Sequence, residues 1–402
     1  MKQSRRLYFL SRFTHGLKAS IYRFGLKKFN RHWYFILIAT FFAFAGCSPR
    51  AAYKESDVPD SKKKIGKIQS EFLKTKLVCF GRYALEVPIE TQLIAGSFWM
   101  PSTLQIYENG ENRMMQLVNK EIEKIKNDDK TMEIKYNSNG PQKGTWQIRY
   151  FEDAISKRMN QLNFTTYISR GDHIFVMGDA VERGQTEQQV AERQASFVNR
   201  LRLREEDEVP GESGFCIDHA FVSESKYDQQ EFATAGIFMP SFPDVSFSIS
   251  SNKDAYGDYT KEEFENEQRA KLSLLARIGQ AQKDQPNSYP YRHVLREGKR
   301  DIHHWHGEES LFVRNDGTHD FEWALVGTPR DVANPSEFNV VMHTKVAHNT
   351  VGAADRASLS DDEAVALFDR LLSGLKFRVK VPGAPEGSYY FPEQKPPAGQ
   401  AR

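Results

Sequence analysis

One short sequence occurs twice in this chain of 402 residues, once in each half. The first copy reads AGSFWMPS and covers residues 95–102, and a copy one residue shorter, AGIFMPS, covers residues 235–241. A cysteine in an apolar run precedes each copy, Cys79 before the first and Cys216 before the second. The copies begin 140 residues apart, at positions 95 and 235, which is too long for a solenoid repeat and suits two globular domains. We therefore predict two copies of one domain.

The two halves also end alike, each with an amphipathic helix that runs into a strand with alternating basic residues. FVNRLRLR at residues 197–204 matches LLSGLKFR at residues 371–378. The second of these helices begins with a capping box, Ser360 followed three residues later by Glu363. Strand-like runs and helical periodicities alternate in both halves. The predicted fold class is α+β, with two related lobes that each consist of a mostly antiparallel sheet with two helices. We interpret the basic strands as solvated sheet edges.

The amino-terminal segment has the composition of a secretory signal. Nine Lys or Arg and no acidic residue lie in residues 1–32, an apolar run follows at residues 33–44, and AGC ends at Cys47. The small residues before Cys47 resemble a lipobox, in which the thiol receives a lipid and becomes the new amino terminus. The alternative is an uncleaved anchor helix, because the apolar run is close to the length that a membrane span needs. Both alternatives place the rest of the chain outside the cytoplasm. Ser48 after the cysteine favours the outer membrane.

The charge balance depends on this segment. The whole chain has 55 basic and 53 acidic side chains; without the nine basic residues of the signal, 46 remain against 53, a net charge of −7. The slight basicity therefore belongs to the signal, and composition gives no support for nucleic-acid binding.

Changes in composition along the chain divide it into five parts. We predict a signal peptide at residues 1–46, a polar tether at 47–70, an amino-terminal lobe at 71–207, a carboxy-terminal lobe at 208–382 and a disordered, proline-rich tail at 383–402.

Cys79 and Cys216 are the two cysteines that remain if Cys47 carries a lipid. Two thiols in an oxidising compartment often form a disulfide. Duplication alone would also produce two separate buried cysteines on equivalent strands, since free cysteine is among the most buried residue types. Both alternatives stay open at the level of sequence.

Motifs of common enzymes are absent from the sequence: it has no nucleophile elbow, zinc-protease helix, P-loop or dinucleotide-binding loop. HHWH at residues 303–306 is the one local concentration of metal-ligand side chains, and a third ligand would have to come from His293 or His319. We favour an exposed polar strand over a metal site, and we expect no cofactor. The acids Glu308 and Glu309 that follow are more typical of a solvated turn than of acid–base catalysis.

Several motifs resemble the group-four immunity proteins that neutralise phospholipase effectors of type VI secretion. In the first half the resemblance lies in VCFGRY at residues 78–83 and LEVP at residues 85–88. In the second half it lies in FCI at 215–217, LREGKR at 295–300, GEE at 307–309, FEW at 321–323 and the segment 360–378. The resemblance covers about residues 77–380. The histidines at 303–306 depart from the family pattern.

The resemblance implies a protein without catalytic activity that binds a cognate lipase effector and blocks it. It implies no small-molecule substrate, a periplasmic location, and attachment through Cys47, which we expect at the inner leaflet of the outer membrane. Two rigid lobes on a short linker could close on such a partner from both sides. We predict Trp305, Glu308, Glu309 and Trp323 as partner-facing residues. The competing hypotheses are a lipid-anchored hydrolase and a metal-binding lipoprotein.

Overall fold

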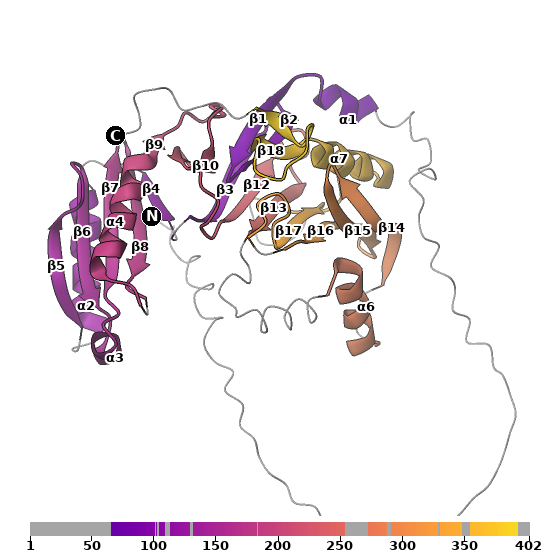
Figure 1. The fold of residues 1–402 in the computed structure, drawn as a ribbon. Helices are drawn as coiled ribbons and strands as arrows, with labels where there is room; N and C mark the ends of the chain where they lie inside the picture. The colour runs from indigo at the N-terminus through magenta and orange to yellow at the C-terminus, as the bar shows by residue number, and fades with distance from the viewer. Residues whose placement is uncertain are drawn as a thin grey trace, which may run out of the picture. The chain divides into compact units, whose positions relative to one another are not determined.

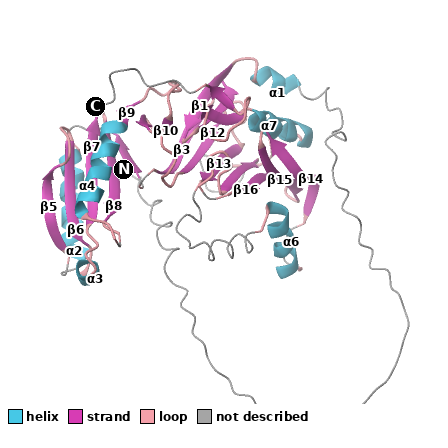
Figure 2. Cartoon of the chain, in the orientation of Figure 1, coloured by secondary structure: helices cyan, strands magenta, loops and turns pink. Residues whose placement is uncertain are grey.

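The computed structural model describes residues 66–100, 102, 104–108, 113–128, 132–182, 184–253, 272–287, 291–328, 330–347 and 354–392. The predicted signal peptide, Cys47, the tether up to residue 65 and the tail from residue 393 lie outside the described residues. Within the described part no helix is long and apolar enough to cross a membrane. The described residues form four sheets with helices packed against them, as Figures 1 and 2 show.

The first half contains four helices and nine strands. They are, in chain order, α1 (Gly66–Glu71), β1 (Thr75–Phe80), β2 (Tyr83–Pro88), β3 (Gln92–Trp99), β4 (Leu104–Glu108), α2 (Met114–Asp128), β5 (Glu133–Asn139), β6 (Thr145–Phe151), α3 (Ala154–Arg158), β7 (Asn163–Arg170), β8 (His173–Ala180), α4 (Glu187–Arg200) and β9 (Leu201–Leu203).

The described elements of the second half follow this order without counterparts of α1 and α3 and with one further strand, β19. These elements are β10 (Gly214–Ile217), β11 (Ala220–Ser223), β12 (Phe232–Phe238), β13 (Ser246–Asn252), α6 (Leu274–Asp284), β14 (Arg292–Ile302), β15 (Trp305–Arg314), β16 (His319–Val326), β17 (Glu337–His343), α7 (Asp361–Ser373), β18 (Leu375–Val379) and β19 (Tyr389–Phe391).

The two halves also share their strand pairing, which confirms the two predicted related lobes and the predicted α+β class. The first half has a five-stranded sheet with the order β4-β8-β7-β6-β5. The corresponding strands of the second half have the same order, β13-β17-β16-β15-β14, within a seven-stranded sheet that β12 and β3 extend. Neighbouring strands in both sheets are antiparallel, and β18 with β19 forms the parallel pair among the described strands.

In each half, the strand that follows the closing helix pairs with a strand of the other half. Strand β9 of the first half pairs with β11 of the second, where Leu201 lies opposite Val222. Strand β18 of the second half pairs with β2 of the first, where Leu375 lies opposite Leu85. The two pairings are equivalent under the repeat, so the exchange of strands is reciprocal.

The strands in which the repeated motifs begin, β3 and β12, pair with each other, and the first residues of the two copies, Ala95 and Ala235, lie opposite each other. The first copy has one residue more, and a β-bulge absorbs it: Gly96 and Ser97 face the single residue Thr234. Thr234 Oγ1 accepts a hydrogen bond of 2.7 Å from the Ser97 amide. A Cβ on Gly96 would lie 2.2 Å from the same oxygen, so the bulge requires glycine there.

One core joins the two halves. The largest cluster of buried side chains takes residues from β1 and β2, from α4, from the inner face of the seven-stranded sheet and from α7. Phe368 of α7 contacts the rings of Phe247 and Phe321 on that face. The predicted capping box is present, since Ser360 and Glu363 each accept a hydrogen bond from the other's backbone amide.

The apolar run at residues 77–87 lies in the hairpin β1–β2, which turns at Gly81 and Arg82. Gly81 has φ = 53°, a backbone conformation that favours glycine. A Cβ at this position would also lie only 2.9 Å from the Cβ of Ala233.

Candidate functional site

Trp305 and Trp323, which we predicted to face a partner, belong to the core. Both indoles are 0% exposed. Trp305 Nε1 donates to the carbonyl of Ala333 at 2.8 Å, and Trp323 Nε1 donates to the carbonyl of Arg300 at 3.0 Å. A side chain without exposed surface cannot contact a partner, so these two predictions are wrong.

The two acids next to Trp305 are also structural. Glu309 is buried and forms ion pairs with Arg296 at 2.5 Å and with Arg300 at 3.1 Å, and both arginines also bind Asp369 on α7. Burial would lower the pKa of Arg296, but Asp369 and Glu309 outweigh it and raise that pKa. Glu308 is half-buried and accepts a hydrogen bond from the backbone amide of Leu275 at the start of α6. These contacts hold β15 to α7 and α6, and they replace the predicted partner contacts.

The histidines at residues 303–306 are separated by the fold. His303 and His304 form the turn between β14 and β15, so His304 does not share a strand face with His306. His304 Nε2 lies 2.9 Å from the carbonyl of Ala333, and His306 pairs with Asp301 at 3.0 Å. Burial lowers the pKa of both His303 and His304. Among the described residues no group of three or more His, Cys, Asp or Glu side chains could hold a metal ion.

A buried hydroxyl, a histidine and a carboxylate lie in line beneath α7. His319 Nδ1 is 2.9 Å from Thr344 Oγ1, and His319 Nε2 is 3.0 Å from Asp361. Thr344 also accepts the backbone amide of His319 at 3.0 Å and is 1% exposed. A substrate could not reach this hydroxyl, so the arrangement fastens the start of α7 to the sheet.

Cys79 and Cys216 form a disulfide in the structure. The two residues are 1% and 0% exposed, and they pack against Ala84 and Phe221. Of the two alternatives that the sequence left open, the structure has the bridged one. The bond joins equivalent positions of the two halves next to the exchanged strands.

The segment between the halves is held by the two basic strands. Arg204 at the end of β9 donates to the carbonyls of Glu208 and Ile217. Its counterpart Arg378 on β18 is 0% exposed and donates to the carbonyls of Pro210, Glu212 and Gly214. Burial lowers the pKa of both guanidinium groups. Our interpretation of these strands as solvated edges is therefore wrong for Arg204 and Arg378, and the linker is bound rather than free.

A buried ion cluster fixes the β1–β2 turn to the second half. Arg82 binds Glu231 through two hydrogen bonds of 3.0 and 2.6 Å, and its third contact is the carbonyl of Glu224. Burial would lower the pKa of Arg82, but Glu231 raises it more. Lys253 lies 3.7 Å from the same carboxylate. Arg82 belongs to the VCFGRY motif, so this motif serves the joint between the halves.

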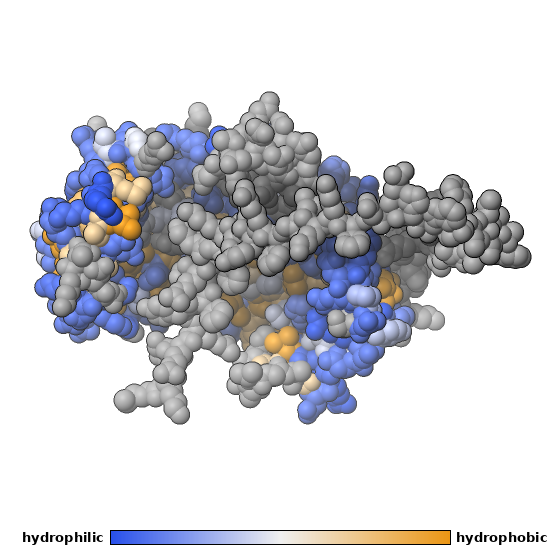
Figure 3. Space-filling view, turned by 90° about the horizontal axis from the view of Figure 1, so that it is seen from below, coloured by the Kyte–Doolittle hydropathy of each residue, from blue (hydrophilic) through white to orange (hydrophobic). Residues whose placement is uncertain are grey.

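The candidate interaction surface is the outer face of the seven-stranded sheet at β3, β12, β13 and β17. Helix α6 covers the neighbouring strands β15 and β16, where Arg277 pairs with Glu322 at 3.0 Å. No described element covers the four other strands. Ile94 and Trp99 of β3 are 50% and 37% exposed, and Phe232 lies opposite Trp99 in register. In the view of Figure 3 most of the described surface is hydrophilic, and hydrophobic patches are few.

Sequence reasoning did not find this surface, because it predicted no strand at residues 92–99. The signal was present: in β3 the outward residues alternate with Leu93 and Ala95, which face the core. The alternation is weak, because three of the eight residues of β3 are small (Ala95, Gly96 and Ser97).

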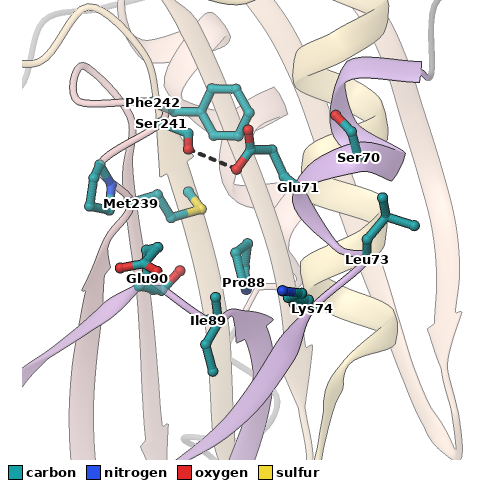
Figure 4. A pocket seen from close by; sticks show the side chains of 12 residues that line it. Ser70, Glu71, Leu73, Lys74, Pro88, Ile89, Glu90, Met239, Ser241 and Phe242 are labelled. Carbon is teal, nitrogen blue, oxygen red and sulfur yellow. Dashed lines mark hydrogen bonds between the residues drawn. The ribbon is translucent and has the colours of Figure 1, made fainter.

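A pocket of about 290 Å³ lies at another place, between α1, the β2–β3 turn and the β12–β13 turn. Figure 4 shows Leu73 and Lys74 on the α1 side and Met239 and Ser241 opposite them, with a hydrogen bond from Ser241 to Glu71. The second repeated motif, which includes Met239, Pro240 and Ser241, therefore forms one wall of the pocket.

Comparison with known proteins gives the family. The model of the Tle cognate immunity protein 4 N-terminal domain matches residues 76–207, and the model of the C-terminal domain of the same protein matches residues 208–380. No curated protein matches the chain.

Solved structures share the fold. The apo structure of the immunity protein TplEi of T6SS from Pseudomonas aeruginosa is 20% identical, with a TM-score of 0.59 over 76% of this chain and 97% of that one. The crystal structure of the Tle4-Tli4 complex contains a chain that is 21% identical, with a TM-score of 0.59 and the same coverage. TplEi bound to an "L" peptide gives a TM-score of 0.56 at 19% identity. Since the two domain models together span residues 76–380, the chain belongs to the Tle cognate immunity protein 4 family.

Proposed function

We propose that this protein binds a cognate phospholipase effector of type VI secretion outside the cytoplasm and inhibits it, and so protects the cell that carries it. The observation that carries the proposal is the match of both family domains, in order and without a gap, to residues 76–380. The fold shared with an immunity protein and with a chain of the Tle4-Tli4 complex supports it.

The disulfide supports an oxidising compartment. Disulfides persist in secreted and periplasmic proteins and are rare in the cytosol. A buried bridge between Cys79 and Cys216 therefore agrees with export by the signal at residues 1–46. We propose lipid attachment at Cys47 and a position at the outer membrane, which would keep the inhibitor beside the bilayer that a phospholipase attacks.

Inhibition by binding needs no reaction by the inhibitor, and we propose that this protein has none. The one arrangement of hydroxyl, histidine and carboxylate described above is closed to substrate, because Thr344 is 1% exposed. The ion clusters at Arg82 and Glu309 are also buried and bind main chain or helices.

We propose the outer sheet face at β3 and β12 as the surface that contacts the effector. Exposed aromatic and aliphatic side chains surrounded by polar residues are typical of interface hot spots. Ile94 and Trp99 provide these exposed side chains, the half-buried Phe232 lies opposite Trp99, and the serines of β13 provide the polar surround. Strand pairing fixes all of them, so little conformational entropy is lost on binding.

The decisive experiment measures phospholipase activity of the cognate effector with increasing amounts of the purified chain. We expect complete inhibition near one equivalent. An effector that stays fully active in excess chain would contradict the proposed function.

Variants then test the surface. Trp99→Ala and Ile94→Asp should each weaken effector binding about tenfold or more, the loss typical of a hot-spot residue. Ile155→Asp is the matched control, because Ile155 on α3 is 55% exposed and lies outside the surface. Inhibition by all three variants equal to that of the unchanged chain would place the contact elsewhere.

A further inference from the structure

The pocket beside α1 has an apolar lining and an apolar rim. Its lining includes Pro88, Met239 and Phe242. At the rim Leu73 is 82% exposed and Ile89 is 45% exposed, and Leu73 is the most exposed large apolar side chain of the described residues. A protruding leucine beside an apolar hollow is a costly feature for a surface that faces only water.

One polar group in this pocket has no partner. Thr91 lines the pocket and is 0% exposed, and among the described residues its Oγ1 has no hydrogen-bond partner. This hydroxyl has no exposed surface, so it cannot contact a ligand. The accessible part of the lining is therefore mainly apolar.

The charges around the pocket balance. Lys74 and Glu90 are exposed members of the lining, Glu71 accepts a 2.7 Å hydrogen bond from Ser241, and Lys67 lies over the Phe242 ring at 5.2 Å. Two cations and two anions give no net charge. Such a rim complements a headgroup that carries one phosphate and one ammonium group, and it does not attract a strongly anionic surface.

The pocket lies close in sequence to the proposed anchor. Gly66, the first described residue, follows Cys47 by 19 positions, and the α1 wall ends at Lys74. The α1 wall also precedes residue 76, where the family match begins. It is thus a feature outside the matched domains and near the end that would be attached to the membrane.

We propose that this pocket and its rim dock on the surface of a phospholipid bilayer. Leu73 and Ile89 enter the interfacial layer, and the pocket receives the glycerol and upper acyl part of one zwitterionic phospholipid against Pro88, Met239 and Phe242. The premise that a bilayer lies nearby depends on the lipid anchor proposed at Cys47. The docking surface follows from the pocket and its rim and does not depend on that anchor. Docking would hold the α1 end at the membrane and leave the outer face of the seven-stranded sheet free for the effector.

Flotation with vesicles tests the docking without the anchor. The chain from Ser48 to Arg402 lacks Cys47 and keeps every helix, strand and the disulfide that the structure describes. Mixed with vesicles of phosphatidylethanolamine and phosphatidylcholine, it should float with the lipid, and added salt should change the bound fraction little, because the contact is mainly apolar. Failure to float, or flotation only when phosphatidylglycerol is added, would overturn the proposal.

Substitutions locate the contact. The double variant Leu73→Asp, Ile89→Asp should bind vesicles at least about tenfold more weakly. In the unchanged chain both apolar side chains move from water into the bilayer, and aspartate does not gain from that transfer. Val294→Asp is the matched control, because Val294 is 42% exposed on β14, outside the pocket, and it should bind like the unchanged chain.

The thermal unfolding midpoint of each variant shows that it is folded. Unchanged vesicle binding by the folded double variant would overturn the proposal. A folded chain that docks on vesicles but does not inhibit the effector would contradict the proposed function alone, so the two failures are distinguishable.

Discussion

At the scale of single residues, equivalent positions of the two halves carry out one task. Arg204 and Arg378 occupy the same place in the repeat, and each binds backbone carbonyls of the segment between the halves. A guanidinium group has five N–H donors in a fixed plane and can satisfy several carbonyls at once. The linker is ordered because these arginines supply hydrogen bonds that it does not make with strands.

Arg378→Met should lower the free energy of unfolding by about 3 kcal/mol or more, because it leaves three carbonyls of residues 210–214 without a donor. Arg378→Lys should recover only part of the loss, since an ammonium group cannot span the three acceptors. Chemical denaturation measures both. Arg356→Met, at an exposed position, should change stability by less than about 0.5 kcal/mol; equal stability of the Arg378 and Arg356 variants would show that the linker contacts contribute nothing.

The roles of single aromatic and acidic residues could not be predicted from the sequence. Trp323 is a core residue because Gly307 on the neighbouring strand leaves room for its indole; a Cβ at Gly307 would lie 2.5 Å from the ring. Glu309 is buried because Arg296 and Arg300 come to it from β14. Both facts depend on the pairing of β14, β15 and β16, which no short motif encodes.

At the scale of elements, the sequence predicted features that depend on neighbouring residues, such as the start of a helix. The helices that close the two halves, α4 and α7, both begin with capping boxes, and the one at Ser360 was readable from its spacing. Strands β5 and β14 were missed. Both lie at the edges of their sheets and carry polar or charged residues on both faces, so they lack the alternation that marks a half-buried strand.

Ser360→Ala should lower the free energy of unfolding by about 1 kcal/mol, since it removes the acceptor for the Glu363 amide and the partner of the Glu363 carboxylate. Thermal unfolding followed by circular dichroism measures the loss. Ser373→Ala, at the other end of α7, removes only an exposed hydrogen bond to Arg370 and serves as the control. A Ser360 variant as stable as this control would mean that packing alone, through Phe368 and its neighbours, sets the start of α7.

At the scale of the whole molecule, the sequence repeat predicted two related halves but not how they combine. Duplication explains the shared strand order. The reciprocal exchange of β9 and β18, the pairing of β3 with β12 and the disulfide all join one half to the other, and none of them follows from similarity between the halves.

Removal of the disulfide by Cys79→Ala with Cys216→Ala should lower the free energy of unfolding by about 4 kcal/mol. The bridge closes a loop with a sequence separation of 137, and long loops gain most from closure in the chain-entropy model. Because both cysteines are buried, a mild reductant should leave the native protein bridged, and reduction should become fast only after unfolding. Chemical denaturation compares three samples: the oxidised chain, the chain that has been unfolded and reduced, and the double variant. Equal denaturation midpoints for all three would contradict the expected stabilisation by the disulfide.

The exchange of strands also predicts that the two family domains cannot fold apart. In a chain that ends at residue 207, β2 lacks its neighbour β18 and β3 lacks β12, and Tyr83 loses the rings of Phe338 and Phe377, whose centroids lie 4.9 and 5.2 Å away. In a chain that begins at residue 208, β11 lacks β9. We expect residues 66–207 and 208–392 to be insoluble or partly unfolded when produced singly in the periplasm, and to copurify as a disulfide-linked pair when produced together. The contrary result would be a folded, monomeric half in which hydrogen exchange shows native protection of β2 or β11. It would show that each half folds without the exchanged strand of the other half.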